Sequence, residues 1–187
     1  MRVIAGKFRS RQLRSLPGLD IRPTSDRLRE TLFDVLTAVS PEALQRSVWL
    51  DLFAGTGAVG IEALSRGAEE VYFVESSRKA AELISRNLAS LGIAAGFEIL
   101  RQRAAQAILQ LQARRIVPDF IFLDPPYEME TAYEETLHAL ACSQLSKRAL
   151  IIAEHQKKFD PGEKVGKLAR TRKLVQGDAG LSFYSLL

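Results

Sequence analysis

Short apolar runs alternate with amphipathic segments along most of the chain. The apolar runs predict five β-strands, in chain order Val48–Phe53, Val71–Glu75, Phe97–Leu100, Phe120–Leu123 and Leu150–Glu154. Apolar residues at helical spacing predict helices between them, at Ala58–Arg66, Arg78–Leu91, Ala104–Arg114 and Thr131–Ala141. Short buried strands that alternate with helices are typical of a parallel sheet covered on both faces.

The C-terminal part departs from this alternation. Thr171–Val175 and Leu181–Leu186 predict two strands joined by a short turn that contains Gly177 and Gly180. A turn of this length joins antiparallel neighbours. The expected fold class is therefore α/β, a Rossmann-like, seven-stranded, mostly parallel sheet whose last hairpin is antiparallel.

The N-terminal part also departs from it. Arg2–Ala5 and Gln12–Leu16 are typical of short strands around a Gly6-Lys7 turn, so we expect a β-hairpin. A helix should begin near Asp26, capped by Thr24 or Ser25, and end before Ser40-Pro41. We expect two parts, a basic N-terminal hairpin extension at residues 1–20 and one domain at residues 21–187.

Composition excludes several classes of protein. A chain of 187 residues with 47% hydrophobic content is long enough for one well-buried core. The longest apolar runs are far shorter than a membrane span, and residues 1–19 lack the apolar stretch of a signal peptide. One cysteine and two histidines allow no internal disulfide and no metal site of normal spacing, so we expect a cytoplasmic protein without a metal.

Positive charge gathers in two segments, although the net charge is only +4. Residues 1–19 contain no acidic side chain and five basic ones, Arg2, Lys7, Arg9, Arg11 and Arg14. Residues 156–173 contain seven basic side chains and two acidic ones. Both segments favour a polyanionic partner over ordinary solvated surface. Arg22, in a rigid Arg-Pro-Thr turn, could reach a phosphate or a carboxylate.

A glycine-rich loop follows the first strand of the alternating part. Gly55, Gly57 and Gly60 form the pattern G-x-G-x-x-G, with Asp51 near the carboxyl end of the strand before it. A strand, a tight glycine loop and a helix bring the backbone close to a nucleotide-like ligand. A purely structural tight turn is the alternative explanation of this pattern.

Two further strand ends carry candidate cofactor residues. Glu75 ends the second strand, where an acidic residue commonly accepts hydrogen bonds from ribose hydroxyls. Arg103 and Ala104 follow the third strand, and backbone groups there, or Gln102, could contact an adenine.

The fourth strand ends in Asp124-Pro125-Pro126-Tyr127. Two prolines stiffen the turn and remove two N–H donors, so the carbonyls of Asp124 and Pro125 should point outward with few internal partners. A carboxylate beside a carbonyl matches an NH₂ group, and Tyr127 offers a face on which a base can stack. An ordinary Asp-Pro turn is the structural alternative.

Other side chains with chemical potential receive structural interpretations. We expect His138 and His155 to be structural or exposed, Cys142 to be a small buried side chain and Trp49 to face the core. Asn87 lies in the middle of a helix, where a local hydrogen bond is the ordinary explanation.

These motifs resemble those of class I S-adenosylmethionine-dependent methyltransferases that act on exocyclic amines. The resemblance rests on D-L-F-A-G-T-G at 51–57, Glu75 and D-P-P-Y at 124–127. Nearly the whole chain resembles the RsmD family of bacterial 16S ribosomal RNA guanine-N2 methyltransferases. That part of the resemblance includes R-V-I-A-G-K-F-R-S-R-Q-L at 2–13, R-P-T-S-D-R-L-R-E-T-L-F-D-V-L at 22–36 and E-H at 154–155.

The resemblance implies S-adenosylmethionine as methyl donor and 16S RNA, within the 30S subunit or an assembly intermediate, as partner of a monomeric enzyme. It implies direct in-line transfer, with catalytic residues Asp124, Pro125 and Tyr127. The implied cofactor-binding residues are Asp51, Phe53, Gly55, Gly57, Glu75, Ser76, Arg103, Ala104 and Asp124, and the expected RNA-binding residues are Arg2, Lys7, Arg9, Arg11, Arg14 and Arg22. This sequence lacks the acidic side chain that many adenosine sites place near Arg103.

Three other functions fit part of the sequence. A DNA adenine-N6 methyltransferase would use the same D-P-P-Y box, but the chain shows no separate target-recognition domain. A nicotinamide-dependent oxidoreductase would explain the glycine pattern and leave D-P-P-Y without a role. A non-enzymatic RNA-binding module would explain only the basic N-terminal segment.

Overall fold

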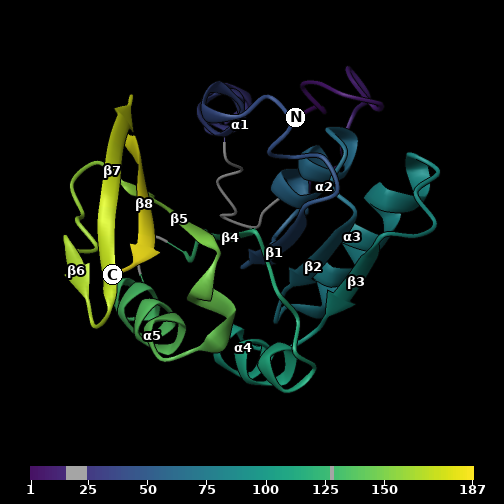
Figure 1. Ribbon diagram of the computed structural model, residues 1–187. Coiled ribbons are helices and arrows are strands. Elements are labelled where there is room, and N and C mark those ends of the chain that lie inside the picture. Colours follow the sequence, from purple (N-terminus) through teal and green to yellow (C-terminus); the bar gives the residue numbers. More distant parts are fainter. Residues whose placement is uncertain (16–24, 127–128) are drawn as a thin grey trace.

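A single mixed β-sheet crosses the molecule (Figure 1). The computed structural model describes residues 1–15, 25–126 and 129–187. In these ranges the strands are β1 (Val48–Leu52), β2 (Glu70–Val74), β3 (Phe97–Leu100), β4 (Phe120–Leu123), β5 (Leu150–Gln156), β6 (Lys164–Val165), β7 (Leu168–Gln176) and β8 (Ala179–Leu186). Their order across the sheet is β3-β2-β1-β4-β5-β8-β7-β6.

The strand directions confirm the predicted arrangement. Strands β1 to β5 pair in parallel, β8 is antiparallel to β5, and β7 is antiparallel to β8. The sequence prediction missed β6, which pairs with β7 at the edge of the sheet. A strand of two residues is too short to show a periodic pattern.

Helices cover both faces of the sheet (Figure 1). Helices α1 (Asp26–Val39), α2 (Ala58–Ser65) and α3 (Arg78–Ser90) contribute to the core on one face. Helices α4 (Ala104–Ala113) and α5 (Glu130–Ala141), with the short 3₁₀ helix η1 (Gln144–Lys147), contribute to the core on the other. None of these helices is long and apolar enough to cross a bilayer, as far as residues 1–15, 25–126 and 129–187 are concerned.

The alternation of side chains along β1 divides the core between the two faces. Trp49 is fully buried against Phe33 of α1 and Phe120 of β4, with ring centroids 5.3 and 4.7 Å away. Its neighbour Leu50 points to the opposite face and joins the cluster under α4 and α5. Trp49 therefore faces the core, as predicted. Ser25 caps α1 by accepting a hydrogen bond from the Leu28 N–H (3.1 Å), which confirms the predicted start of that helix.

Residues 1–15, here called the N-terminal arm, double back as predicted but do not form two strands. Their ladder is one isolated antiparallel bridge, Arg2 to Gln12, and residues 16–20 of the expected hairpin lie outside the described ranges. In a hairpin, backbone N–H groups of the arm would donate to a partner strand. Here several of them donate to α2. The Ile4 and Ala5 N–H groups donate to Glu62 (2.7 and 2.9 Å), and the Lys7 N–H donates to the Ser65 carbonyl (2.7 Å). The arm is thus an extension docked on α2 (Figure 1).

Candidate functional site

The carboxyl ends of four parallel strands lie in a row at one edge of the sheet. Leu52 of β1 pairs with Val74 of β2 on one side and Leu123 of β4 on the other, and Val74 pairs with Leu100 of β3. The chain leaves β1 towards β2 and later returns on the opposite side as β4. Such a reversal of strand order opens a crevice where ligands of α/β sheets bind. The predicted cofactor-binding residues lie at or just after these four strand ends.

The loop after β1 has the backbone of a close-approach turn. Phe53, Gly55 and Gly57 all have positive φ angles, of 64°, 55° and 77°. The Gly57 N–H donates to the Ala54 carbonyl (2.7 Å), which closes the turn immediately before α2. Left-handed φ values at Gly55 and Gly57 explain why the loop needs glycine at both places.

Gly60 has a different role from the two loop glycines. A Cβ atom built on it would lie 2.3 Å from a ring carbon of Phe73 and 2.7 Å from a methyl carbon of Val71. The third glycine of the pattern therefore allows α2 to pack closely on β2.

Asp51 holds the start of α2. Its carboxylate is 2% exposed and accepts a hydrogen bond from the Gly60 N–H (2.9 Å). Burial raises the pKa of Asp51 to about 7, the bond from Gly60 opposes this rise, and the nearby Glu75 adds to it. Asp51 is thus a carboxyl group that changes charge near neutral pH.

Glu75 ties the loop after β1 to the loop after β2. One carboxylate oxygen accepts from the Gly55 N–H (2.9 Å) and the other from the Ser77 N–H (2.7 Å). Its own N–H donates to the Leu100 carbonyl (3.1 Å), so three neighbouring strand ends are joined. Each carboxylate oxygen keeps a lone pair that can accept from a ligand hydroxyl. Ser76, beside it, is exposed.

Arg103 and Ala104 lie at the same edge, at the start of α4. Arg103 is the exposed N-cap residue, and Ala104 is buried. In the described part of the chain, neither α4 nor α2 has a side-chain cap at its N-terminus. Backbone N–H groups in these first turns can therefore serve a ligand.

The turn after β4 places Asp124, half-buried, beside the β1 loop in the row of strand ends. The Pro125 carbonyl accepts from the Tyr133 hydroxyl (3.3 Å), which also lies 2.9 Å from the Glu154 carbonyl. The sequence did not predict this partner, which α5 brings to the Pro125 carbonyl by packing on the sheet. Tyr127 lies outside the described residues.

Tyr133 and Asn87 are residues whose positions the sequence analysis missed. Tyr133 belongs to the apolar stripe of α5, and only the stripe was visible in the sequence. Asn87 was expected to make a local hydrogen bond, but it is fully buried and bonds to the arm and to the glycine loop. A polar residue on the buried stripe of α3 was the available signal.

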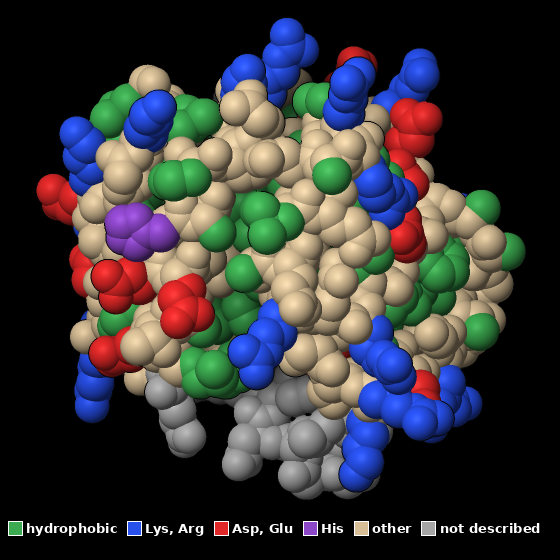
Figure 2. Space-filling view, turned by 90° about the horizontal axis from the view of Figure 1, so that it is seen from below, with side chains coloured by type: hydrophobic (Ala, Val, Ile, Leu, Met, Phe, Trp, Pro, Cys, Tyr) green, Lys and Arg blue, Asp and Glu red, His purple; other side chains and the backbone are tan. Residues whose placement is uncertain are grey.

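The arm presents its cationic side chains to solvent. Arg2, Lys7, Arg9, Arg11 and Arg14 are all exposed, although Arg11 donates to the Ser90 carbonyl (3.1 Å) and Arg2 lies 4.0 Å from Asp26. Arg22 lies outside the described residues. Figure 2 shows the face formed by α4 and α5, where Lys and Arg lie mostly around the margin. The arm does not belong to that face, since it lies on the side of α2 (Figure 1).

The second basic segment is partly neutralised. Asp160 accepts from Arg170 and from Lys173 (2.7 Å to Lys173), and these bonds, with Arg170 first, lower the pKa of Asp160 below its usual range. Arg170 also lies 3.6 Å from Glu163. This segment therefore offers fewer free cations than its composition suggested.

The remaining candidates have structural positions. His155 is buried, with one ring nitrogen 2.8 Å from the Gln156 carbonyl and the other 2.9 Å from the Ser182 hydroxyl, and His138 is exposed. Cys142 was expected to be buried but is exposed, because it lies one residue beyond the last turn of α5. Within the described ranges, no three acidic, histidine or cysteine side chains gather as a metal site would require.

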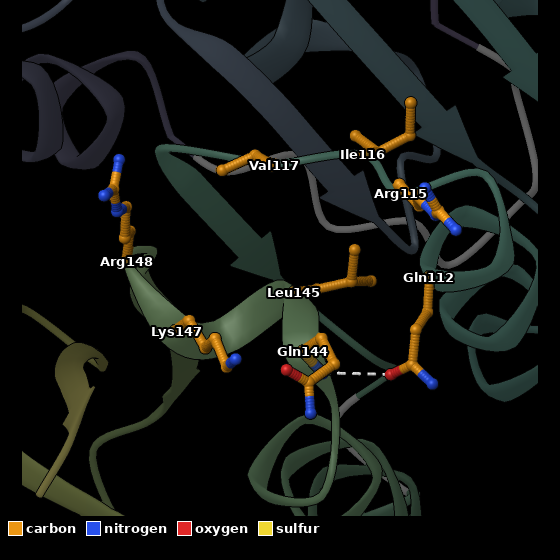
Figure 3. Close-up of a pocket in the computed structure, with 8 residues that line it drawn as sticks. All are labelled: Gln112, Arg115, Ile116, Val117, Gln144, Leu145, Lys147 and Arg148. Carbon is orange, nitrogen blue, oxygen red and sulfur yellow. Dashed lines mark hydrogen bonds between the residues drawn. The ribbon is translucent and has the colours of Figure 1, made fainter.

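A surface hollow lies at the opposite edge of the sheet (Figure 3). It is bordered by the end of α4, the segment before β4 and η1, and three cations line it, Arg115, Lys147 and Arg148. These elements precede β4 and β5, so the hollow is at the amino ends of the strands. It is separate from the row of strand ends that carries the site.

Comparisons with known proteins agree with one another. The family model described as Conserved hypothetical protein 95 matches residues 1–185. The Bacillus subtilis protein “Putative rRNA methyltransferase YlbH” is 35% identical over 189 residues, which cover 98% of this chain and 98% of that protein. Ribosomal RNA small subunit methyltransferase D of Haemophilus influenzae is 37% identical over 160 residues, 84% of this chain and 79% of that protein.

A solved structure has the same fold. The structure titled “Putative methyltransferase yhhF from Escherichia coli” matches with a TM-score of 0.82 and 32% identity, and covers 100% of this chain and 97% of that one.

Proposed function

We propose that this chain, which belongs to the family described as Conserved hypothetical protein 95 and has the sequence motifs of the RsmD family, is a methyltransferase. It transfers a methyl group from S-adenosylmethionine to the N2 amine of a guanine in 16S ribosomal RNA. The substrate is the RNA within the small subunit or an assembly intermediate, and the enzyme acts as a cytoplasmic monomer. The observation that carries the proposal is the pairing of Leu52 with Leu123, which sets the glycine loop beside Asp124.

The residues at the row of strand ends fit S-adenosylmethionine. Gly55 leaves the loop backbone without a side chain where a nucleoside must approach, and Gly57 supplies the left-handed φ that the turn needs. Glu75 is held by two backbone bonds and keeps lone pairs for the ribose hydroxyls. Phe53, Ser76, Arg103 and Ala104 border the same edge, and the uncapped first turn of α4 offers N–H groups to the adenine. When bound, the cofactor supplies a methyl group made electrophilic by a sulfonium.

Asp124 and Pro125 fit the acceptor amine. A half-buried carboxylate and the second lone pair of the Pro125 carbonyl can each accept a hydrogen from one NH₂ group. These bonds draw the amine lone pair out of conjugation with the ring and aim it at the methyl group, and Asp124 takes the released proton late in the step. Tyr127 supplies a stacking face for the base, which must leave its own stack at a cost of a few kcal/mol.

The cationic arm fits the phosphate backbone around the target. Five exposed basic side chains lie on a segment whose backbone is fixed to α2. Phosphate contacts of this kind position an RNA without reading its sequence. Arg22 joins this group in the proposal.

The test is methyl transfer from labelled S-adenosylmethionine to three acceptors in parallel, namely small subunits that lack the modification, naked 16S RNA and duplex DNA. The product is digested and its nucleosides are identified. N2-methylguanosine from subunits or RNA supports the proposal. N6-methyladenine from DNA would overturn the substrate and keep the chemistry. Cofactor binding with no label on any acceptor would overturn the substrate class.

A further inference from the structure

Both ends of the arm are connected to Thr56, the residue between Gly55 and Gly57, one directly and the other through Asn87. The Thr56 hydroxyl lies 3.8 Å from the sulfur of Met1, a hydrogen-bonding distance for sulfur. The other end reaches Thr56 through Asn87 of α3, whose side-chain N–H group donates to the Thr56 carbonyl (3.0 Å) and to the Arg14 carbonyl (3.2 Å). The Asn87 Oδ1 accepts from the Arg14 N–H (2.9 Å). One side-chain amide therefore holds the arm and the glycine loop together.

The amide of Asn87 has no spare hydrogen. The side chain is fully buried, and its two N–H hydrogens serve two different segments. Removal of the amide would leave the Thr56 carbonyl and both backbone groups of Arg14 short of a partner, and a buried polar group without a partner is costly. If Arg14 moves, Asn87 must therefore move with it to keep these bonds, and the glycine loop must move with Asn87.

Most other anchors of the arm bond to α2, although Arg29 of α1 also donates to the Arg2 carbonyl and Arg11 donates to the Ser90 carbonyl of α3. Glu62 holds Ile4 and Ala5, and the Ser65 hydroxyl accepts from the Phe8 N–H (3.0 Å). These bonds join the arm to α2 and do not involve the glycine loop. Asn87 therefore differs from them, since it joins the segment proposed to meet RNA to the segment proposed to meet the cofactor.

We propose that Asn87 is a positioning residue that couples RNA binding on the arm to cofactor binding in the glycine loop, an inference that rests on the function proposed above. RNA phosphates bound to Arg11 and Arg14 hold the arm in one position. The hydrogen bonds of the Asn87 amide then restrict the motion of the Thr56 carbonyl, and with it that of the glycine loop. By thermodynamic linkage, the cofactor must then raise the affinity for RNA by the same factor that RNA raises the affinity for the cofactor.

The experiment measures RNA binding by filter retention with and without saturating S-adenosylhomocysteine, the unreactive product. The RNA or subunit is the one that accepts a methyl group in the test above. We expect the wild-type protein to bind it about 5-fold or more tightly with the product present, within the usual range of coupling between sites. Asn87→Ala should bring this ratio close to one. Ser85→Ala is the matched control, because Ser85 lies on the same helix and bonds to the Ala81 carbonyl (3.2 Å) of that helix; it should keep the wild-type ratio.

A second pair of variants tests the link without touching the buried amide. Arg14→Ala removes the cation and keeps the backbone N–H, whereas Arg14→Pro also removes the donor to Asn87. Both should bind RNA more weakly, but only Arg14→Pro should lose the coupling. Equal ratios in the wild type, Asn87→Ala and Arg14→Pro would overturn this inference alone. A wild-type protein that binds neither product nor RNA would overturn the proposed function as well.

Discussion

The carboxylate of Glu75 accepts a hydrogen bond from the backbone N–H of Gly55, at 2.9 Å, across two neighbouring strand ends. Gly55 has a left-handed backbone that is strained for other residues, and this carboxylate holds its N–H. The residue expected to hold the ribose is thus also the residue that shapes the glycine loop. Loss of Glu75 should affect the cofactor site twice.

Glu75→Ala should weaken cofactor binding by about 5- to 150-fold, because the Gly55 and Ser77 N–H groups lose their acceptor, at a cost of about 1–3 kcal/mol. Calorimetric titration with S-adenosylhomocysteine measures this change. Glu70→Ala, at the opposite end of β2, is the matched control and should bind normally. Normal affinity in Glu75→Ala would remove Glu75 from the cofactor site.

Asp124→Ala should lower the rate of methyl transfer by at least about 100-fold, since it removes the acceptor for the amine proton. Cofactor affinity should stay near that of the wild type, because the glycine loop and Glu75 remain. Asp119→Ala, at the other end of β4, removes an exposed carboxylate that accepts from the Val48 N–H (2.8 Å) and should keep the wild-type rate. Wild-type turnover in Asp124→Ala would refute the catalytic assignment.

Asp51→Asn should change how stability depends on pH. The folded protein holds a proton on Asp51 up to about pH 7, whereas the unfolded chain releases it near the ordinary pKa of 3.8. In that interval the folded state binds more protons, so the contribution of Asp51 to the free energy of unfolding falls as the pH rises from about 4 to about 7. Urea denaturation at several pH values should show the wild type losing stability relative to Asp51→Asn across this window. A pH-independent difference between the two proteins would contradict the assigned shift.

Glu62→Ala should destabilise the protein by about 3–5 kcal/mol, the usual cost of breaking a buried ion pair. Glu62 is fully buried, accepts from Arg66 (2.8 Å) and faces Arg29, whose side chain is also fully buried. Glu82 of α3 pairs with Arg78 and Arg86 at the surface, so Glu82→Ala should cost about 0–1 kcal/mol. Similar urea midpoints for the two variants would contradict the expected cost of breaking the buried ion pair.

Replacement of Arg9, Arg11 and Arg14 by Ala should weaken RNA binding and flatten its dependence on salt, with the slope falling by about one for each phosphate that the arm no longer neutralises. The control removes the same charge from the hollow of Figure 3, as Arg115→Ala, Lys147→Ala and Arg148→Ala together. The control should keep a slope close to that of the wild type. Equal slopes for the two triple variants would mean that RNA does not contact the arm specifically.

Much of the fold could be predicted because each long element has its own periodic signal. The strands Phe97–Leu100 and Phe120–Leu123 have the predicted bounds, and their parallel direction follows from the alternation with helices. The N-terminal arm could not be predicted in the same way. Its backbone donors bond to Glu62 and Ser65, more than fifty residues away, and such a long-range partner leaves no mark on the local pattern.

The residues of the candidate site also separate into those with a local sequence signal and those that depend on long-range contacts. The glycine loop, Glu75 and Asp124 could be found from their places at strand ends. Asn87 and Tyr133 could not, because each was one polar residue on an otherwise ordinary buried stripe. Their roles depend on which segments the tertiary structure brings to those stripes.

The exposed position of Cys142 has a practical consequence. It is the one thiol in the sequence, and it follows α5, which runs antiparallel to the strands that it connects. A maleimide dye would therefore attach at a single place, near the amino ends of the strands and away from Asp124 and the arm. The natural protein can thus be labelled with one fluorophore, without any engineered residue and without a dye at the proposed site.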